Sequence, residues 1–261
     1  MPNLQRLHAT EPWEWPEDTA DLLLTVLKNP AASEKDCLLA AEMAGDLTVV
    51  NDDLVDALLA IATRSGDSLP LRCAALRALG PVLDDADMQE EGFLDALPVT
   101  DKKIDAIRDT LQALHDGCGH PDELRRAALE TSVRWPEEWH ADAIREALAC
   151  HWTLTAVFCM RYVEGFSEDI MQALNGGSPE IRGQALLAAA AWEVQEAWPH
   201  VLAVLAQNSS DADTLIAAIE AAASLRPDQA EVFLRPFTRH RNERVAAAAE
   251  DAIATADLGE P

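Results

Sequence analysis

The chain has 261 residues, of which 49% are hydrophobic but only 5% aromatic, so it can bury a large apolar area with mostly small side chains. Acidic residues outnumber basic ones by 46 to 20, which gives a formal net charge of −26. A field of this sign repels nucleic-acid phosphates and anionic membranes, which require clustered Lys and Arg. We therefore expect neither nucleic acid nor a membrane as a partner.

The first residues and the longest apolar runs argue against targeting and membrane insertion. Residues 1–21 are acidic and contain tryptophan, unlike a signal peptide. The run from Ala185 to Trp192 is far shorter than the roughly 18 residues of a membrane span. An odd number of cysteines without framework spacing predicts free thiols and a cytoplasmic location. They are Cys37, Cys73, Cys118, Cys150 and Cys159.

Proline and helical periodicity divide the chain into alternating first and second helices of a repeated pair. Prolines in Trp-Pro dipeptides at Trp15, Trp135 and Trp198 start first helices, because proline fits the first helical turn and cannot continue a preceding helix. We predict first helices at 17–28, 51–64, 101–115, 137–150, 166–175, 199–207 and 227–238. We predict second helices at 33–45, 68–83, 121–134, 152–163, 179–192, 212–225 and 242–255.

A short motif, apolar-Arg-x-x-Ala-Leu, recurs on the second helices at residues 71–76, 124–129 and 181–186. With Ser178-Pro179-Glu180 before the third copy, it resembles the HEAT-repeat family over nearly the whole chain. That resemblance implies an all-α fold, a right-handed α–α superhelix of about seven HEAT-like helical pairs. It also implies a single repeat domain spanning 1–261.

The arginine of this motif has a structural role in the HEAT family. There it commonly pairs with an aspartate ladder that links neighbouring repeats. Arg72, Arg125 and Arg182 match the arginine position, whereas no equivalent aspartate recurs regularly in this chain. A continuous ladder is therefore not expected.

One segment breaks the repeat period, since the distance from Leu71 to Leu124 exceeds one repeat by about twenty residues. The excess is an acidic insertion around 84–100, which lacks Lys and Arg in its acidic part but contains Met88 and Phe93. One interpretation is a solvated loop held by a few apolar contacts. The other is a docking loop for a basic partner.

Tryptophans give the clearest binding candidates, because a large rigid ring with one donor is typical of binding hot spots. We predict partner contacts at Trp139, His140, Trp152 and Trp192, with filling of gaps between small alanines as the alternative. A cluster of three other residues offers possible metal ligands, His115, Cys118 and His120, but its spacing matches no standard zinc site. We therefore predict no metal and no other cofactor.

The C-terminal repeat differs from the rest in charge, because arginines gather around His240. It is interpreted either as a salt-bridged polar cap or as one end of an end-to-end self-association. The arginines are Arg226, Arg235, Arg239, Arg241 and Arg244.

The sequence contains no convincing catalytic set, so an enzyme is the less favoured hypothesis. The leading hypothesis is a non-catalytic protein-binding scaffold or adaptor that uses the concave solenoid face. Its partner would be a protein or peptide, with a basic one such as a toxin as the natural candidate. The alternative is an enzyme or small-ligand-binding protein with a pocket in the central repeats that contain Trp139, His140 and Trp152.

Overall fold

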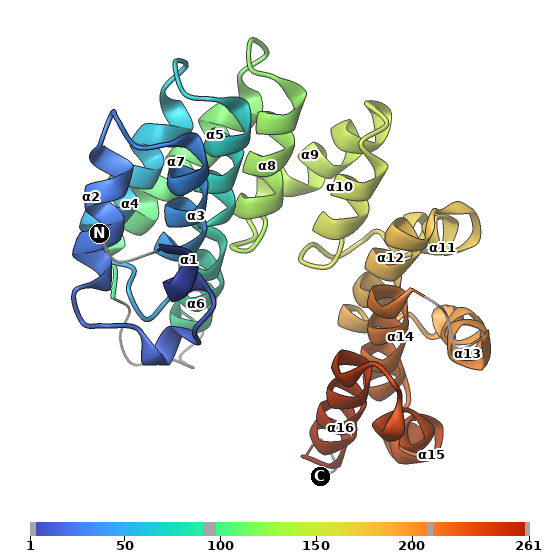
Figure 1. Cartoon of the computed structure of the whole chain (residues 1–261). Helices are drawn as coiled ribbons and strands as arrows, with labels where there is room; N and C mark the ends of the chain where they lie inside the picture. The colour runs from blue at the N-terminus through green and yellow to red at the C-terminus, as the bar shows by residue number, and fades with distance from the viewer. Residues whose placement is uncertain (1–3, 91–97, 208–210, 259–261) are drawn as a thin grey trace. The chain divides into compact units, whose positions relative to one another are not determined.

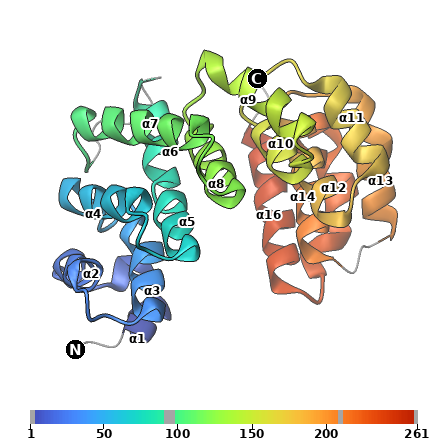
Figure 2. The same ribbon diagram turned by 90° about the horizontal axis from the view of Figure 1, so that it is seen from above.

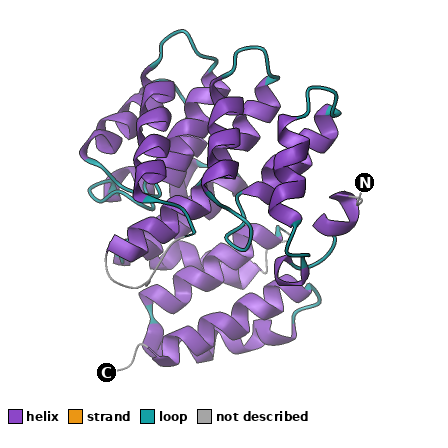
Figure 3. Ribbon diagram, turned by 90° about the vertical axis from the view of Figure 1, so that its left-hand side faces the viewer, coloured by secondary structure: helices purple, strands orange, loops and turns teal. Residues whose placement is uncertain are grey.

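The computed structural model describes residues 4–90, 98–207 and 211–258, and in this part of the chain all regular structure is helical (Figure 3). None of the helices described is both long and apolar enough to cross a membrane. The contacts between residues divide the chain into two compact units, Met1–Glu137 and Glu138–Pro261.

The first unit consists of helices in two layers (Figures 1 and 2). The first helices α2, α4 and α7 form one layer, and the second helices α3, α5 and α8 form the other. In chain order the elements are α1 (Leu4–His8), η1 (Pro12–Glu14), α2 (Thr19–Lys28), α3 (Glu34–Ala44), α4 (Asp52–Thr63), α5 (Leu69–Arg77), α6 (Gly80–Glu90), α7 (Asp101–Asp116) and α8 (Asp122–Ser132).

The second unit repeats this arrangement, with α12, α14 and α16 packed in a row. Short 3₁₀ segments interrupt its first helices. The elements are α9 (Glu138–Ala149), α10 (Thr153–Cys159), α11 (Ser167–Gly176), α12 (Pro179–Ala191), η2 (Gln195–Ala197), α13 (Trp198–Gln207), α14 (Ala212–Leu225), η3 (Pro227–Gln229), α15 (Ala230–Leu234), η4 (Arg235–Arg239) and α16 (Glu243–Leu258).

These elements confirm the predicted fold class, an α–α superhelix of HEAT-like helical pairs. Within the described ranges seven first helices each pack against the following second helix: α2 with α3, α4 with α5, α7 with α8, α9 with α10, α11 with α12, α13 with α14, and α15 with α16. A repeat array can continue through two compact units, so the single repeat domain over 1–261 stays a prediction.

Several predicted elements differ from the structure in detail, among them the helix predicted at 227–238, which is divided into η3, α15 and η4. The helix predicted at 68–83 is broken between α5 and α6, because Pro81 has no N–H to continue the ladder. Residues 84–90 of the acidic insertion are helical, as part of α6, and not a loop. Residues 91–97 lie outside the described part of the chain. The helix predicted at 152–163 ends at Cys159, where the following residues turn instead.

The starts of the helices follow from their capping residues. Ser33, Asn51, Ser68, Ser178 and Asp211 each precede a helix, and each side-chain oxygen accepts a hydrogen bond from the backbone N–H three residues later. Such a bond satisfies a donor that has no partner inside the helix. Four of the five caps begin second helices, and the fifth, Asn51, begins the first helix α4.

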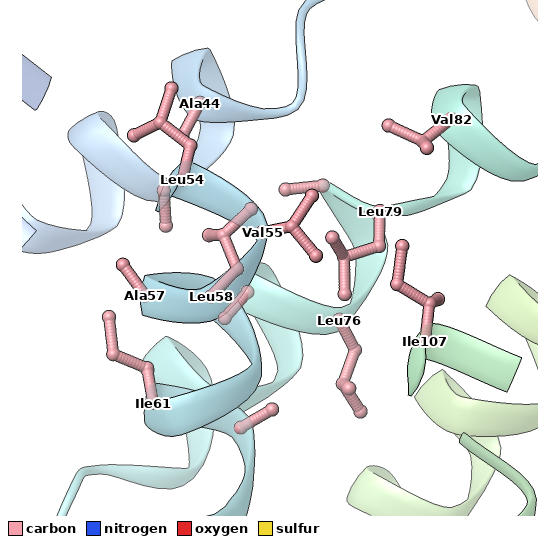
Figure 4. Packing of buried hydrophobic residues seen from close by; sticks show 14 of the residues in the cluster. Ala44, Leu54, Val55, Ala57, Leu58, Ile61, Leu76, Leu79, Val82 and Ile107 are labelled. Atoms are coloured by element: carbon pink, nitrogen blue, oxygen red, sulfur yellow. The ribbon is translucent and has the colours of Figure 1, made fainter. Parts of the chain in front are cut away.

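The core of the first unit combines large side chains between the layers with small ones between second helices. Figure 4 shows Val55 and Leu58 of α4 gathered with Leu76, Leu79 and Ile107, all completely buried. On the second helices several buried positions are alanines, which let neighbouring helices approach closely. They include Ala40, Ala41, Ala44, Ala75, Ala127 and Ala128.

The motif arginines bind the C-terminal ends of first helices. Each guanidinium donates a hydrogen bond to a backbone carbonyl at the C-terminus of the first helix in its own pair. The positive charge there opposes the negative end of the helix dipole and satisfies a carbonyl without an intrahelical partner. The bonds run from Arg72 Nε to Ala62 O (2.8 Å), from Arg125 Nε to His115 O (2.7 Å) and from Arg182 Nη2 to Gly177 O (3.3 Å).

We expect Arg72→Met to lower the free energy of unfolding by about 1.5–3 kcal/mol, because it removes a buried charged donor and leaves the Ala62 carbonyl unsatisfied. Arg77→Met on the same helix is the matched control. Its guanidinium is 59% exposed and lies 3.9 Å from Glu130, so its loss should change stability by less than about 0.5 kcal/mol. Urea denaturation measures both, and equal effects would contradict the capping role.

Gly45 ends α3 where that helix meets the end of α5. A Cβ atom at this position would lie 1.8 Å from the Ala78 carbonyl oxygen, which belongs to the backbone and cannot rotate away. We expect Gly45→Ala to destabilise the protein by about 1–3 kcal/mol through overpacking. A thermal melt measures the change. Gly119→Ala, where a Cβ would meet nothing within 4 Å, is the control and should leave stability unchanged. Equal loss of stability in both variants would contradict the overpacking at Gly45.

Candidate functional site

Two of the predicted binding tryptophans lie at helix ends closed by the same turn. His151 and Glu193 have positive φ values of 60° and 48°, and they follow the last residues of α9 and α12. The next amides, of Trp152 and Val194, bond back to carbonyls five residues earlier, which is the Schellman pattern. Trp152 directly follows the left-handed residue His151, and Trp192 directly precedes the left-handed residue Glu193. The turns therefore fix where both indoles leave their helices.

The four predicted partner-binding residues differ in accessibility. Trp139 and His140 stack with ring centroids 3.9 Å apart, but His140 is completely buried. Trp192 is 36% exposed, and its indole N–H donates to the Met160 carbonyl oxygen at 2.7 Å. Trp152 is half-buried. None of the four lines the pockets described below, and their role in partner binding stays a prediction.

The tryptophans that precede proline pack against arginines. The Arg108 guanidinium lies 4.7 Å from the Trp135 ring centroid, and that of Arg226 lies 5.3 Å from Trp198. Trp15 instead donates its indole N–H to the Leu7 carbonyl oxygen at 2.9 Å. Each ring thus has contacts that hold the start of a first helix in place.

The structure places the three weak metal candidates in and beside the turn between α7 and α8. His115 is buried, and its Nδ1 lies 3.3 Å from the Arg125 carbonyl oxygen, while Cys118 is exposed and contacts the backbone of Asp116. His120 packs against Gly117. Among the residues described, no three His, Cys, Asp or Glu side chains are grouped so that they could hold a metal ion.

A pocket of about 510 Å³ lies in the first unit, between the turn joining α2 to α3 and the turn joining α4 to α5. Its apolar wall consists of Leu27, Ala57, Ala60, Ile61 and Leu71. This volume lies within the range of about 300–1,000 Å³ typical of small-molecule sites. The pocket combines this apolar wall with convergent polar groups.

Three carboxylates lie on the polar side of the pocket, and two of them interact with a neighbouring side chain. Glu34, Asp56 and Asp67 line it together with Lys28 and Arg64. The Ser68 hydroxyl donates to Glu34, and Lys103 forms an ion pair with Asp56. Because Ser68 is also the N-cap of α5, the local fold fixes the position of Glu34.

Asp67 differs from its neighbours in hydrogen bonding. Its Oδ2 atom lies 3.4 Å from Arg64 Nη1, and the side chain is 21% exposed. Within the described structure this oxygen is buried yet accepts no hydrogen bond. The Arg64 guanidinium compensates part of the charge from this distance, and a ligand N–H that bonded to Oδ2 directly would add the missing hydrogen bond.

The pKa of the Cys37 thiol reflects the electrostatic field inside the pocket. Burial raises the pKa of its thiol, and the carboxylates of Asp36, Asp67 and Glu34 raise that pKa further. Both effects disfavour the thiolate, so Cys37 is a poor nucleophile. The same negative field favours a cationic group beside it.

Sequence reasoning did not find this pocket. Its lining comes from two turns and four helices of two successive pairs, and turn residues such as Gly66 and Asp67 carry no repeat signal. The acidic residues among them are indistinguishable in the sequence from other acidic residues of a −26 chain. The sequence feature that could have pointed to the pocket is the position of Cys37 and Glu34 at the start of a second helix.

Comparisons with known proteins identify similar architectures only. No family model and no curated protein matches the chain. Among solved structures, YibA of E. coli is 13% identical with a TM-score of 0.45, over 93% of this chain and 84% of YibA. Human deoxyhypusine hydroxylase, solved in complex with glycerol, is 15% identical with a TM-score of 0.42, over 98% of this chain and 97% of that one.

The prediction of a non-catalytic protein-binding scaffold acting through a concave face is wrong in light of these comparisons. One of the two similar structures is by its name a hydroxylase, so an array of helical pairs does not imply a non-catalytic protein. At this identity the likeness concerns the fold and gives the present chain no activity. The alternative pocket in the repeats with Trp139 and Trp152 gains no support either, because His140 is completely buried.

We expect Asp67→Asn to speed alkylation of Cys37 by iodoacetamide at pH 8. Removing one of the charges that raise the pKa of this thiol lowers that pKa and increases the thiolate fraction. Asp53→Asn, an exposed residue of α4 outside the pocket, is the control and should leave the rate unchanged. Peptide mass spectrometry resolves Cys37 from the other four cysteines, and equal rates in both variants would show that Asp67 does not act on Cys37.

Proposed function

We propose that the first unit binds a ligand with a cationic nitrogen and a short apolar body in the pocket between the α2–α3 and α4–α5 turns. The observation that carries this proposal is Asp67 Oδ2, a buried acceptor without a hydrogen bond at the edge of a pocket of suitable size. An ammonium or guanidinium group would donate to it, while the attached carbon chain would cover Ile61 and Leu71.

The charges around the pocket support a cation over an anion. Glu34 and Asp67 both act on Cys37 from the lining, and Asp36 adds to them from the same helix as Glu34. Arg64 is 59% exposed, so it can turn toward solvent when a ligand takes its place beside Asp67. The cation could come from a free amine or from a Lys or Arg side chain of a peptide, since both present the same chemistry. The net charge of −26 favours the approach of either.

Two broader predictions belong to this proposal. Membership of the HEAT-repeat family is supported by the recurring motif and by the arginine caps at Arg72, Arg125 and Arg182. A cytoplasmic location is supported by the five cysteines, all of which are free thiols.

Titration with n-butylguanidinium, followed by NMR of the Ile61 and Leu71 methyl groups, tests the proposal. We expect saturable shifts with a Kd of roughly 1 mM, as suits so small a ligand. The neutral alcohol 1-pentanol and the anion valerate should bind at least about fivefold more weakly, because neither brings a positive charge to Asp67. A tetrapeptide, acetyl-Ala-Leu-Arg-Ala-amide, distinguishes the sources: tighter binding than the free guanidinium indicates a peptide ligand.

The matched variants are Asp67→Asn and Asp53→Asn. We expect the first to weaken n-butylguanidinium binding about fivefold, since one exposed or half-buried charge pair contributes up to about 1 kcal/mol. The second changes net charge equally but lies outside the pocket and should bind like the unaltered protein. Equal affinities for all three proteins, or equal binding of valerate, would overturn the proposal.

A further inference from the structure

A second groove lies in the other unit and is independent of the proposed ligand pocket. Helices α14 and α16 pack side by side (Figures 1 and 2), and they leave a groove of about 490 Å³ along their surface. From α14 it is lined by Ile216, Glu220 and Ala223. From α16 it is lined by Arg244, Ala247, Ala248, Asp251, Ala252 and Thr255.

The α16 side of the groove has a charge pattern that is complementary to itself. Arg244, Ala247, Ala248 and Asp251 follow one face of the helix, because positions three, four and seven residues apart are neighbours on a helix surface. The positive and negative groups are seven residues apart, about 10.5 Å along the axis. Ala247 and Ala248 lie midway between them. Both charged side chains and Ala247 are exposed.

We propose that this groove holds the α16 helix of a second copy of the chain, in an antiparallel two-fold contact. With Ala247 and Ala248 at the crossing point, Arg244 of one copy lies opposite Asp251 of the other, and the symmetry forms the pair twice. The alanines at the centre allow the two helices to approach closely, and Ile216 and Ala223 of α14 supply the apolar wall. Such a contact closes as a dimer, unlike end-to-end association, which continues into chains.

The existing contacts of these residues permit this arrangement. Arg244 Nη2 lies 2.8 Å from Asp213 Oδ1 in its own chain, but both side chains are largely exposed, at 69% and 75%. An exposed pair of this kind contributes little stability, and a guanidinium has five donors, so Arg244 can bind both carboxylates. Glu220 adds a further carboxylate to the groove wall within its own unit.

Net charge opposes the contact only at long range. Two chains of −26 repel each other, but at 0.15 M salt the screening length is about 8 Å, so charges beyond the contact act weakly. The groove itself carries Glu220 and Asp251 against Arg244, and the partner's arginine supplies the missing positive charge. Dimerisation is therefore expected at moderate salt and at high protein concentration, as suits a small interface.

Charge exchange tests the proposal by sedimentation equilibrium at 0.15 M salt, up to roughly 0.5 mM chain, where weak contacts populate dimers. The full chain should dimerise, and Arg244→Asp or Asp251→Arg alone should weaken dimerisation at least about tenfold through two like-charge contacts. The double variant R244D/D251R should regain the dimer. An equimolar mixture of the two single variants should form heterodimers, because each then offers the charge that the other lacks.

Two controls separate this contact from other effects. Glu250→Arg changes the charge by the same amount as Asp251→Arg on the neighbouring residue of α16, outside the groove, and should remain dimeric. Asp213→Asn removes only the intrachain pair of Arg244 and should also remain dimeric. Three results would each overturn the proposal: a full chain that is monomeric at every concentration, single variants that dimerise normally, or a double variant and a mixture that do not regain the dimer. Thermal melts by circular dichroism confirm that every variant is folded.

Discussion

Close packing between second helices is the constraint on which the rest of the structure depends. Within each unit the second helices pack against one another, α3 with α5 and α5 with α8 in the first, and α10 with α12, α12 with α14 and α14 with α16 in the second. Alanine at these contacts permits the short interhelical distance, and a Cβ atom added at Gly183 of α12 would lie only 3.7 Å from the Thr214 Cα atom of α14. The turns between first and second helices are then held at fixed spacing, which determines where pockets open between them.

In three of the helical pairs an arginine completes this arrangement by binding the end of the first helix to its own second helix. The bond from Arg72 to the Ala62 carbonyl joins the two helices of a pair where the chain reverses, a place that alanine packing does not reach. The turn that follows Ala62 contains Arg64, Gly66 and Asp67, all of which line the pocket of the first unit. A contact that stabilises the fold therefore also positions the carboxylate that we assign to ligand binding.

Much of the fold could be predicted from the sequence, because proline, capping residues and alanine periodicity act locally. The break at Pro81 was predictable in principle, although the apolar residues Val82 and Leu83 continue the helical pattern and concealed it. Burial of His140 was not predictable, since a histidine beside a tryptophan fits a surface site and a stacked interior pair equally well. The pocket was not predictable either, because it depends on how two distant turns meet.

The acidic composition does not by itself determine what the protein binds. In the pocket of the first unit, Glu34, Asp56 and Asp67 stand against Lys28 and Arg64, which is close to balance in a chain of −26. What distinguishes the pocket is therefore not its number of carboxylates but one oxygen of Asp67 that is buried without a hydrogen-bond donor. Net charge brings cations toward the whole surface, whereas an unsatisfied acceptor beside an apolar wall favours one position and one orientation. In this chain we therefore expect ligand specificity to depend on individual groups such as Asp67 and not on the net charge.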